Sequence, residues 1–169
     1  MNRQCGGCQL CCRLVPVKSL GKPAGQRCQH QRFNKGCAIY ATRPIDCRLW
    51  SCAWLTDPIA SSLSRPDHCG YVIDAMLDFV QQERPDGTMA DFICAQIWID
   101  PKRPDAHRDP KLRAYLRAKN LPALVRFNSD QALFLIYHND RWIEQQSNLS
   151  GRPEHSAQEV QDAIHRVMA

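Results

Sequence analysis

Cysteine residues are concentrated at the start of this chain, where four thiols fall within the string CGGCQLCC. Eight of the 10 cysteines precede residue 53, at Cys5, Cys8, Cys11, Cys12, Cys28, Cys37, Cys47 and Cys52. Thiolates are the ligands with which proteins hold structural zinc and iron–sulfur clusters. Cysteines that serve only as small buried apolar residues have no reason to recur at such short intervals. The pattern therefore predicts a metal-binding region in the first third of the chain.

The leading motif bears on which metal these thiols hold. A structural zinc ion usually takes its ligands as two pairs, each pair from one short Cys-x-x-Cys loop. Here Cys5, Cys8 and Cys11 recur every third residue, and three thiolates from one tight loop plus a distant fourth are more typical of a 4Fe–4S cluster. The match to bacterial ferredoxins is partial, because Cys12 precedes Arg13 rather than proline. We favour a single 4Fe–4S cluster and keep one or two Zn²⁺ ions as the alternative, since eight thiols would equally serve two zinc sites.

A second string contains two of the later cysteines, GCAIYATRPIDCR from Gly36 to Arg48, and is followed by Cys52. Together with CxxCxxCC, this string resembles the YkgJ-type cysteine-cluster family, which is known as a zinc- or iron-chelating domain and whose motif also occurs in flagellin lysine methylases. The resemblance covers about the first third of the chain. It implies that the eight cysteines named above are the cluster positions, and it does not say which of them share a centre. Residues 70–169 carry no motif that maps onto an enzyme, so methylase activity is not carried over.

Side chains near the cysteines could modify such a site. Arg43 and Arg48 would offset thiolate charge and tune the reduction potential of a centre if they lie beside the sulfur atoms. Otherwise they are surface arginines or arginines that clamp the sheet through a carboxylate. Tyr40 and Trp50 would shield the centre from water, or would be ordinary packing residues. Cys11 and Cys12 are adjacent, so they cannot easily point to one metal; one would bind while the other packs, bridges or stays reactive.

The remaining candidate ligands have simpler readings. Cys69 and Cys94 are expected to be core thiols, since free cysteine is often buried. His30 and His68 lie near cysteines and could replace a thiolate, but with eight cysteines present we expect them at the surface. His107 stands among aspartates in the loop-like string PKRPDAHRDP. We expect His107 and these charged side chains to be exposed to solvent.

The bulk properties exclude several classes of function. The chain has a formal net charge of +5, but its 22 Lys and Arg residues are scattered, so nucleic-acid binding is not favoured. No apolar run approaches the roughly 18–20 residues that cross a bilayer, and the N-terminus MNRQCGGC lacks the apolar segment of a secretory signal. We therefore expect no membrane association and a cytoplasmic location, where reducing conditions favour metal ligation over disulfides.

The elements that must position the cysteines suggest an α+β fold, in which a metal-organised cysteine-rich N-terminal region packs on a small antiparallel sheet with one or two helices. We divide the chain into a cysteine-cluster region (1–66), a sheet region with a helix near 109–119 (67–146), and a linker with a C-terminal amphipathic helix (147–169). Within the first region, Leu14 to Val17 could form a short strand, and Thr42 is a possible cap of a helix that begins near Pro44.

The later elements follow from alternation, turns and caps. Strands are expected over 69–73, 77–82 and 92–99, with a turn at Arg84-Pro85-Asp86-Gly87 that makes a hairpin. Asp109 should cap a helix that buries Leu112, Tyr115 and Leu116. A second hairpin is expected over 123–127 and 132–137, then a last strand over 141–144. Ser156 and Glu159 form a capping box before the final helix.

Three classes of function remain open. The first is an iron–sulfur protein for electron transfer, cluster handling or support of a partner enzyme, with a protein partner that is a redox protein or an enzyme subunit. The second is a structural zinc module whose sheet binds a partner protein. The third is an enzyme, for which the sequence offers no glycine-rich dinucleotide or phosphate loop, no GxSxG and no HExxH.

Overall fold

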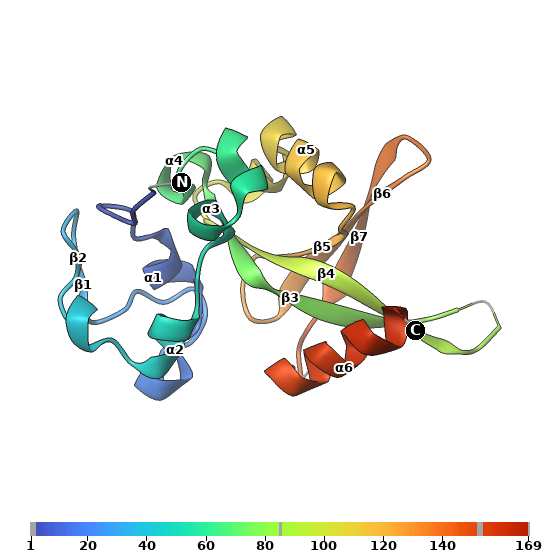
Figure 1. The fold of residues 1–169 in the computed structure, drawn as a ribbon, viewed down its shortest axis with the longest axis horizontal. Helices are drawn as coiled ribbons and strands as arrows, with labels where there is room; N and C mark the ends of the chain where they lie inside the picture. The colour runs from blue at the N-terminus through green and yellow to red at the C-terminus, as the bar shows by residue number, and fades with distance from the viewer. Residues whose placement is uncertain (1–2, 85, 152–153, 169) are drawn as a thin grey trace.

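A five-stranded sheet runs through the centre of the protein (Figure 1), in a computed structural model that describes residues 3–84, 86–151 and 154–168. Its strands follow the order β3-β4-β5-β6-β7. They span Tyr71–Glu83 (β3), Met89–Ile99 (β4), Ala123–Arg126 (β5), Gln131–His138 (β6) and Arg141–Asn148 (β7). The fold is thus mixed α and β, as expected.

The connection between β4 and β5 departs from the expected antiparallel sheet. These two strands pair in parallel, with Ala95 opposite Ala123 and Trp98 opposite Arg126, whereas the other three pairs are antiparallel. The chain leaves β4 through the 3-10 helix η4 (Pro104–Arg108) and returns through helix α5 (Pro110–Lys119). Parallel neighbours need such a crossover, because a tight turn can join only antiparallel strands.

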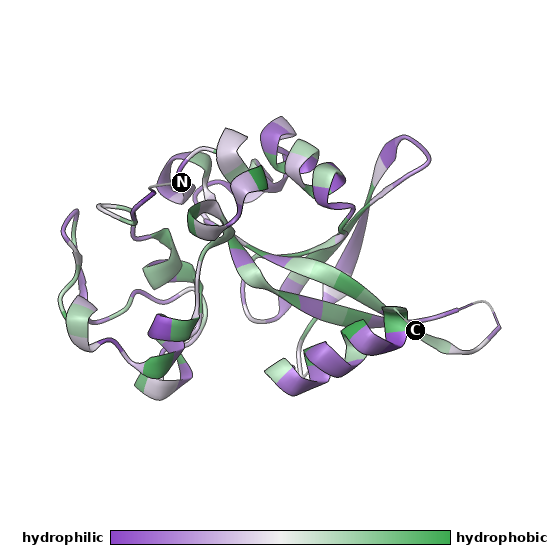
Figure 2. Cartoon of the chain, viewed as in Figure 1, coloured by the Kyte–Doolittle hydropathy of each residue, from purple (hydrophilic) through white to green (hydrophobic). Residues whose placement is uncertain are grey.

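Helix α5 has the predicted boundaries and the predicted buried face. The Asp109 carboxylate accepts a 2.9 Å hydrogen bond from Lys111 N, which makes it the N-cap. Leu112, Tyr115 and Leu116 are buried, and they pack with the inner-facing residues of β4, β5 and β6 in the main core. Figure 2 shows this concentration of hydrophobic residues along the central strands.

Helix α6 (Ala157–Met168) packs beside β3 and β4. Its predicted capping box is confirmed: Ser156 N donates to Glu159 Oε2 at 2.6 Å, and Glu159 N donates to Ser156 Oγ at 3.2 Å. Leu124, Phe134 and Leu149 form a second buried cluster on the sheet. None of the described helices is long and apolar enough to span a membrane.

Three local expectations in the sheet region are wrong or incomplete. Cys69 lies in the short helix α4 (Pro66–Cys69) rather than in a strand, because Gly70 at φ 83° ends that helix. The two strands expected over 69–73 and 77–82 are one strand, β3, with an irregularity in register between Ile73 and Leu77. The turn expected at residues 84–87 joins β3 to β4 through a 2.9 Å bond from Gly87 N to Arg84 O; Pro85 lies outside the described residues.

The N-terminal lobe, residues 3–52, lies at one end of the sheet (Figure 1). It contains helix α1 (Leu10–Leu14), the 3-10 helices η1 (Lys18–Leu20) and η2 (Tyr40–Thr42), and helix α2 (Ile45–Leu49). A two-stranded sheet of β1 (Gln31–Arg32) and β2 (Gly36–Cys37) completes it. Helix α3 (Ala53–Thr56) and the 3-10 helix η3 (Pro58–Ser62) then lead to α4.

Two predictions within this lobe are corrected. The segment from Leu14 to Val17 is not a strand: Leu10 and Leu14, one helical turn apart, are 1% and 4% exposed, so burial of both favours α1. Thr42 does not cap α2, because it ends η2, and the helix begins after Pro44 with no side-chain cap.

Candidate metal centre

The loop before α1 turns tightly between its first two cysteines. Cys8 N donates a 2.8 Å hydrogen bond to Cys5 O, and Gly6 takes φ 48°, a left-handed conformation that glycine adopts without strain. Helix α1 then begins at Leu10 and carries Cys11 and Cys12. Cys5 and Cys8 are therefore joined by a tight turn that contains glycine.

Four thiols line one small cavity beneath the end of the main sheet. They belong to Cys5, Cys8, Cys11 and Cys52, which we call the inner thiol group. The cavity measures about 10 Å³, and its other walls are apolar, formed by Trp54, Leu55, Pro66 and Val72. Cys8 and Cys52 are only 8% and 5% exposed. The leading Cys-x-x-Cys-x-x-Cys run thus shares its cavity with one distant cysteine.

Backbone amides hydrogen-bond to two sulfur atoms of the inner thiol group. Burial raises the pKa of Cys8, and hydrogen bonds from the backbone of Leu10 and Asp67 oppose this rise. Burial raises the pKa of Cys52 to about 12, against similar bonds from Trp54 and Ile73. Hydrogen bonds to sulfur are one of the means by which a protein stabilises thiolate ligands and tunes a metal centre.

Two thiols of the inner group, Cys5 and Cys11, interact directly with each other and with Cys12 around α1. A hydrogen bond with Cys11 lowers the pKa of Cys5 to about 7, and a second bond with Cys11 lowers the pKa of Cys12 to about 7. The hydrogen bond with Cys12 and, to a smaller extent, the hydrogen bond with Cys5 hold the pKa of Cys11 well above its usual range. At neutral pH, Cys5 and Cys12 therefore have the thiolate character that metal ligation requires.

The other four cysteines lie further into the N-terminal lobe. They are Cys12, Cys28, Cys37 and Cys47, all partly exposed, and we call them the outer thiol group. Burial raises the pKa of Cys47, and the thiolates of the other three raise it further. Cys28 N donates a 2.9 Å hydrogen bond to Cys12 O. These four residues therefore neighbour one another.

Basic side chains accompany both groups, in part as expected. The positive charge of Arg43 lowers the pKa of both Cys5 and Cys12, while its guanidinium lies 3.7 Å from the centroid of the Tyr40 ring. No interaction of Arg48 with a thiol is found among the described residues. Sequence reasoning missed Arg65, whose charge lowers the pKa of Cys5, and Lys22, whose charge lowers that of Cys12.

The two aromatic residues differ in position. Trp50 is partly buried against the cluster that contains Cys8 and Cys52, and its indole bonds to Asp74, so it packs beside the inner thiol group. Tyr40 is 57% exposed and stacks with Arg43. The missed residues Arg65 and Trp54 carry no local sequence signal: Trp54 reaches the cavity wall from α3, and Arg65, which precedes α4, acts on Cys5 only through its charge.

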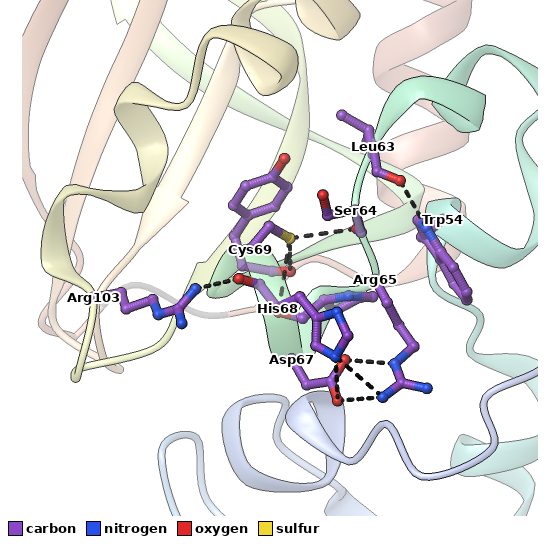
Figure 3. Close-up of polar contacts among 10 residues, drawn as sticks. Trp54, Leu63, Ser64, Arg65, Asp67, His68, Cys69 and Arg103 are labelled. Carbon is purple, nitrogen blue, oxygen red and sulfur yellow. Dashed lines mark hydrogen bonds and ion pairs between the residues drawn. The ribbon is translucent and has the colours of Figure 1, made fainter.

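Cys69 and Cys94 occupy sites apart from both thiol groups. Figure 3 shows the Cys69 thiol against backbone oxygens, with Ser64 O at 3.5 Å and Pro66 O at 3.7 Å. Cys94 is fully buried in β4, and burial raises its pKa to about 12. Cys94 is thus a core thiol as expected, whereas Cys69 is half-buried and packs against the edge of the main core.

The histidines are divided between surface and core. The His68 side chain is 67% exposed and lies beside Asp67 (Figure 3), and His30 neighbours Gln29 at 3.3 Å. His107 contradicts the expected solvated state: it is 5% exposed, with Nδ1 3.0 Å from Pro104 O. The 3-10 helix η4 turns this ring inward against Phe127, which sequence composition alone does not reveal.

Within the described ranges, no three His, Cys, Asp or Glu side chains are close enough together to hold a metal ion as they stand. A cysteine sulfur moves with one torsion, χ1, between staggered positions. The donor chemistry of both thiol groups nevertheless fits a thiolate-bound metal, because soft sulfur ligands favour zinc and iron–sulfur clusters.

Comparisons with known proteins do not identify the chain. No protein-family model matches it, and neither the curated proteins nor the solved structures contain a significant match.

Proposed function

We propose that this protein is an iron–sulfur protein of the YkgJ type. The inner thiol group would hold a 4Fe–4S cluster through Cys5, Cys8, Cys11 and Cys52. One observation carries the proposal: three cysteines that recur every third residue, on the loop before α1 and in α1 itself, line the same apolar cavity as one distant cysteine. That is the ligand pattern which favours a 4Fe–4S cluster.

The surroundings of the inner thiol group support a redox role. A bound 4Fe–4S cluster would supply one-electron transfer. The reduction potential of such a cluster depends on solvent exposure, charge and hydrogen bonds to sulfur. This chain provides apolar walls from Trp54 and Val72, backbone hydrogen bonds to Cys8 and Cys52, and the positive charges of Arg43 and Arg65 near Cys5. These three features would together set the reduction potential of the cluster.

The proposed role is electron transfer, cluster handling or support of a partner enzyme in the cytoplasm. Each of these roles needs a protein partner. Four large apolar side chains of the N-terminal lobe are more than half exposed: Phe33, Tyr40, Ile45 and Leu49. A contiguous patch of exposed apolar side chains marks a surface that meets other proteins.

Anaerobic purification followed by elemental analysis and a visible spectrum tests the proposal. We expect a brown protein that contains iron and acid-labile sulfide, with visible absorption that is lost in Cys8→Ser and kept in Cys94→Ala. A colourless protein with stoichiometric zinc and no electron uptake contradicts it.

A structural zinc module is the second candidate, and the size of the cavity favours it. A cavity of about 10 Å³ is roughly the space that one water molecule needs. A cavity of this size suits a single ion without further opening of the loop. In that case the zinc would stabilise the N-terminal lobe, and the sheet would bind the partner. Stoichiometric zinc together with redox silence supports this candidate.

A further inference from the structure

Segment 18–51 of the N-terminal lobe lacks an apolar core of its own. The structure describes every residue of this segment, and the one buried residue in it is a lysine, Lys22, at 8% exposure. Phe33 and Leu49 are 76% and 73% exposed. A segment that buries so little apolar surface cannot offset the entropy of ordering its backbone. Something other than hydrophobic packing must hold it together.

The outer thiol group lies in or beside this segment, and its members come from four different elements. Cys12 is in α1, Cys28 precedes β1, Cys37 is in β2 and Cys47 is in α2. Backbone bonds link the first three in sequence: Cys28 N to Cys12 O at 2.9 Å, Gln31 N to Cys28 O at 3.1 Å, and the pairing of Gln31 with Cys37. A bond of 2.8 Å from Ser19 N to the Asp46 carboxylate ties α2 to η1.

Helix α1 carries one member of each thiol group. Consecutive residues of an α-helix point about 100° apart around its axis, and the thiols of Cys11 and Cys12 hydrogen-bond to each other where the two groups meet. Cys11 lines the apolar cavity with the inner thiol group, while the carbonyl of Cys12 is bonded to Cys28. At the other end of the lobe, Cys52 forms an isolated β-bridge with Asp74 of β3, whereas Cys47 lies in α2. The early cysteines and the late cysteines therefore each contribute to both thiol groups.

We propose that the outer thiol group is a second and separate metal centre, in which Cys12, Cys28, Cys37 and Cys47 hold one structural Zn²⁺ ion. This inference rests on the proposed function, because it takes the inner thiol group as a centre of its own.

The chemistry of the outer thiol group suits this ion. Structural zinc is held by four protein ligands in closed tetrahedral sites, often four cysteines, and a Zn²⁺ ion with four thiolates carries a net charge of −2. Lys22 is buried beside this group and contributes a positive charge, with its Nζ bonded to the carbonyls of Val15 and Pro23. The binding free energy of zinc would then supply the folding free energy that segment 18–51 lacks.

Single-cysteine variants of the full chain test the separation. Zinc, iron and sulfide per chain are measured on anaerobically purified wild type, Cys37→Ser and Cys52→Ser, with native mass spectrometry to count bound ions. We expect Cys37→Ser to lose one zinc ion per chain and to keep the inner metal, and Cys52→Ser to do the reverse. Cys28→Ser should repeat the result of Cys37→Ser, and far-UV circular dichroism checks that each variant folds.

A measurement on the wild type does not depend on any variant. Zinc removal with a chelator should open segment 18–51 to trypsin at Arg27, Arg32 and Lys35, which are exposed on this lobe. Readdition of one equivalent of Zn²⁺ should restore protection at these three sites. Lys102, which is exposed next to η4 in the sheet region, is the control, since its cleavage should not change.

The outcomes separate this inference from the proposed function. If the wild type holds the inner metal but no zinc, or if Cys37→Ser and Cys52→Ser lose the same metal, the second centre is overturned and the proposed function stands. If Cys37→Ser loses one zinc ion while the inner centre proves to hold zinc rather than iron, the second centre stands and the iron–sulfur proposal fails. A wild type without any metal overturns both.

Discussion

The indole Nε1 of Trp50 donates a 2.8 Å hydrogen bond to Oδ2 of Asp74, and this bond joins the N-terminal lobe to β3. Asp74 lies where the register of β3 shifts, and its other oxygen accepts a 2.9 Å bond from Met76 N. Cys52 pairs with the same residue in an isolated bridge. Asp74 therefore holds two residues of the N-terminal lobe against β3, Trp50 through its carboxylate and Cys52 through its backbone.

The first prediction concerns loss of the Trp50 donor. Burial raises the pKa of Asp74, and the bond from Trp50 opposes that rise. Trp50→Phe leaves a buried carboxylate without one partner, so we expect a loss of about 1–3 kcal/mol in the free energy of unfolding near neutral pH. A double-mutant cycle with Asp74→Asn, measured by urea unfolding, should show coupling between the two residues. Additive effects would contradict the bond.

The pH dependence of this variant follows from the sign of the shift. A carboxyl group with a raised folded-state pKa binds its proton more tightly in the folded protein, so its contribution to stability falls as pH rises from its unfolded pKa of about 3.9. Trp50→Phe should raise the pKa of Asp74 further. The cost of the substitution should therefore shrink as pH falls through the folded-state pKa, and in the Asp74→Asn background this pH dependence should disappear.

The second prediction concerns the start of α5. Asp109 accepts hydrogen bonds from Lys111 N at 2.9 Å and from the Tyr71 hydroxyl at 3.0 Å. Asp109→Ala removes the cap and leaves the hydroxyl of Tyr71, a residue only 2% exposed, without its acceptor. We expect a loss of about 1–3 kcal/mol in the free energy of unfolding, measured by urea denaturation. Asp105→Ala, whose side chain is 76% exposed, is the control and should cost no more than about 1 kcal/mol.

The part of the fold that depends on local signals could be predicted from the sequence. Asp109 before Pro110, and Ser156 three residues before Glu159, are caps whose partners lie within a few positions, and both are present. Alternation in β4 placed Ala95, Ile97 and Ile99 in the main core and Cys94 on the other face. The parallel pairing of β4 with β5 could not be predicted in this way, because it depends on how α5 packs rather than on either strand.

The candidate site shows the same division. The short spacing of Cys5, Cys8 and Cys11 predicts a common loop, and these residues do line one cavity. The contribution of Cys52 to that cavity depends on its bridge to Asp74, a long-range contact of β3. Lys22 approaches the outer thiol group through the bend that pairs it with Val17. No local pattern distinguishes this lysine from a surface lysine.

The third prediction concerns the two cysteines outside the thiol groups. Cys94 is fully buried and Cys69 bonds to backbone oxygens, and burial raises the pKa of both. Cys94→Ala and Cys69→Ser should therefore keep the full metal content of the wild type, measured by elemental analysis. Cys94→Ala should still cost about 1–2 kcal/mol of stability through the cavity that it leaves. Metal loss in either variant, in protein that remains folded, would make that cysteine a ligand.

The last prediction concerns Arg43 and the reactivity of Cys5 and Cys12 in metal-free protein. The pKa of each thiol is lowered to about 7, chiefly by its hydrogen bond with Cys11 and in smaller part by the charge of Arg43. Since the thiolate is the reactive form, alkylation of these two residues should reach half its maximal rate near pH 7, whereas Cys52, with a pKa of about 12, should stay largely unmodified. Arg43→Gln removes a positive charge, so the midpoints for Cys5 and Cys12 should both move to higher pH. Arg48→Gln should leave both midpoints in place, and mass spectrometry of the alkylated peptides measures each site. Equal shifts of the alkylation midpoints in the two variants would mean that the net charge of the protein, rather than the position of Arg43 near Cys5 and Cys12, sets the reactivity.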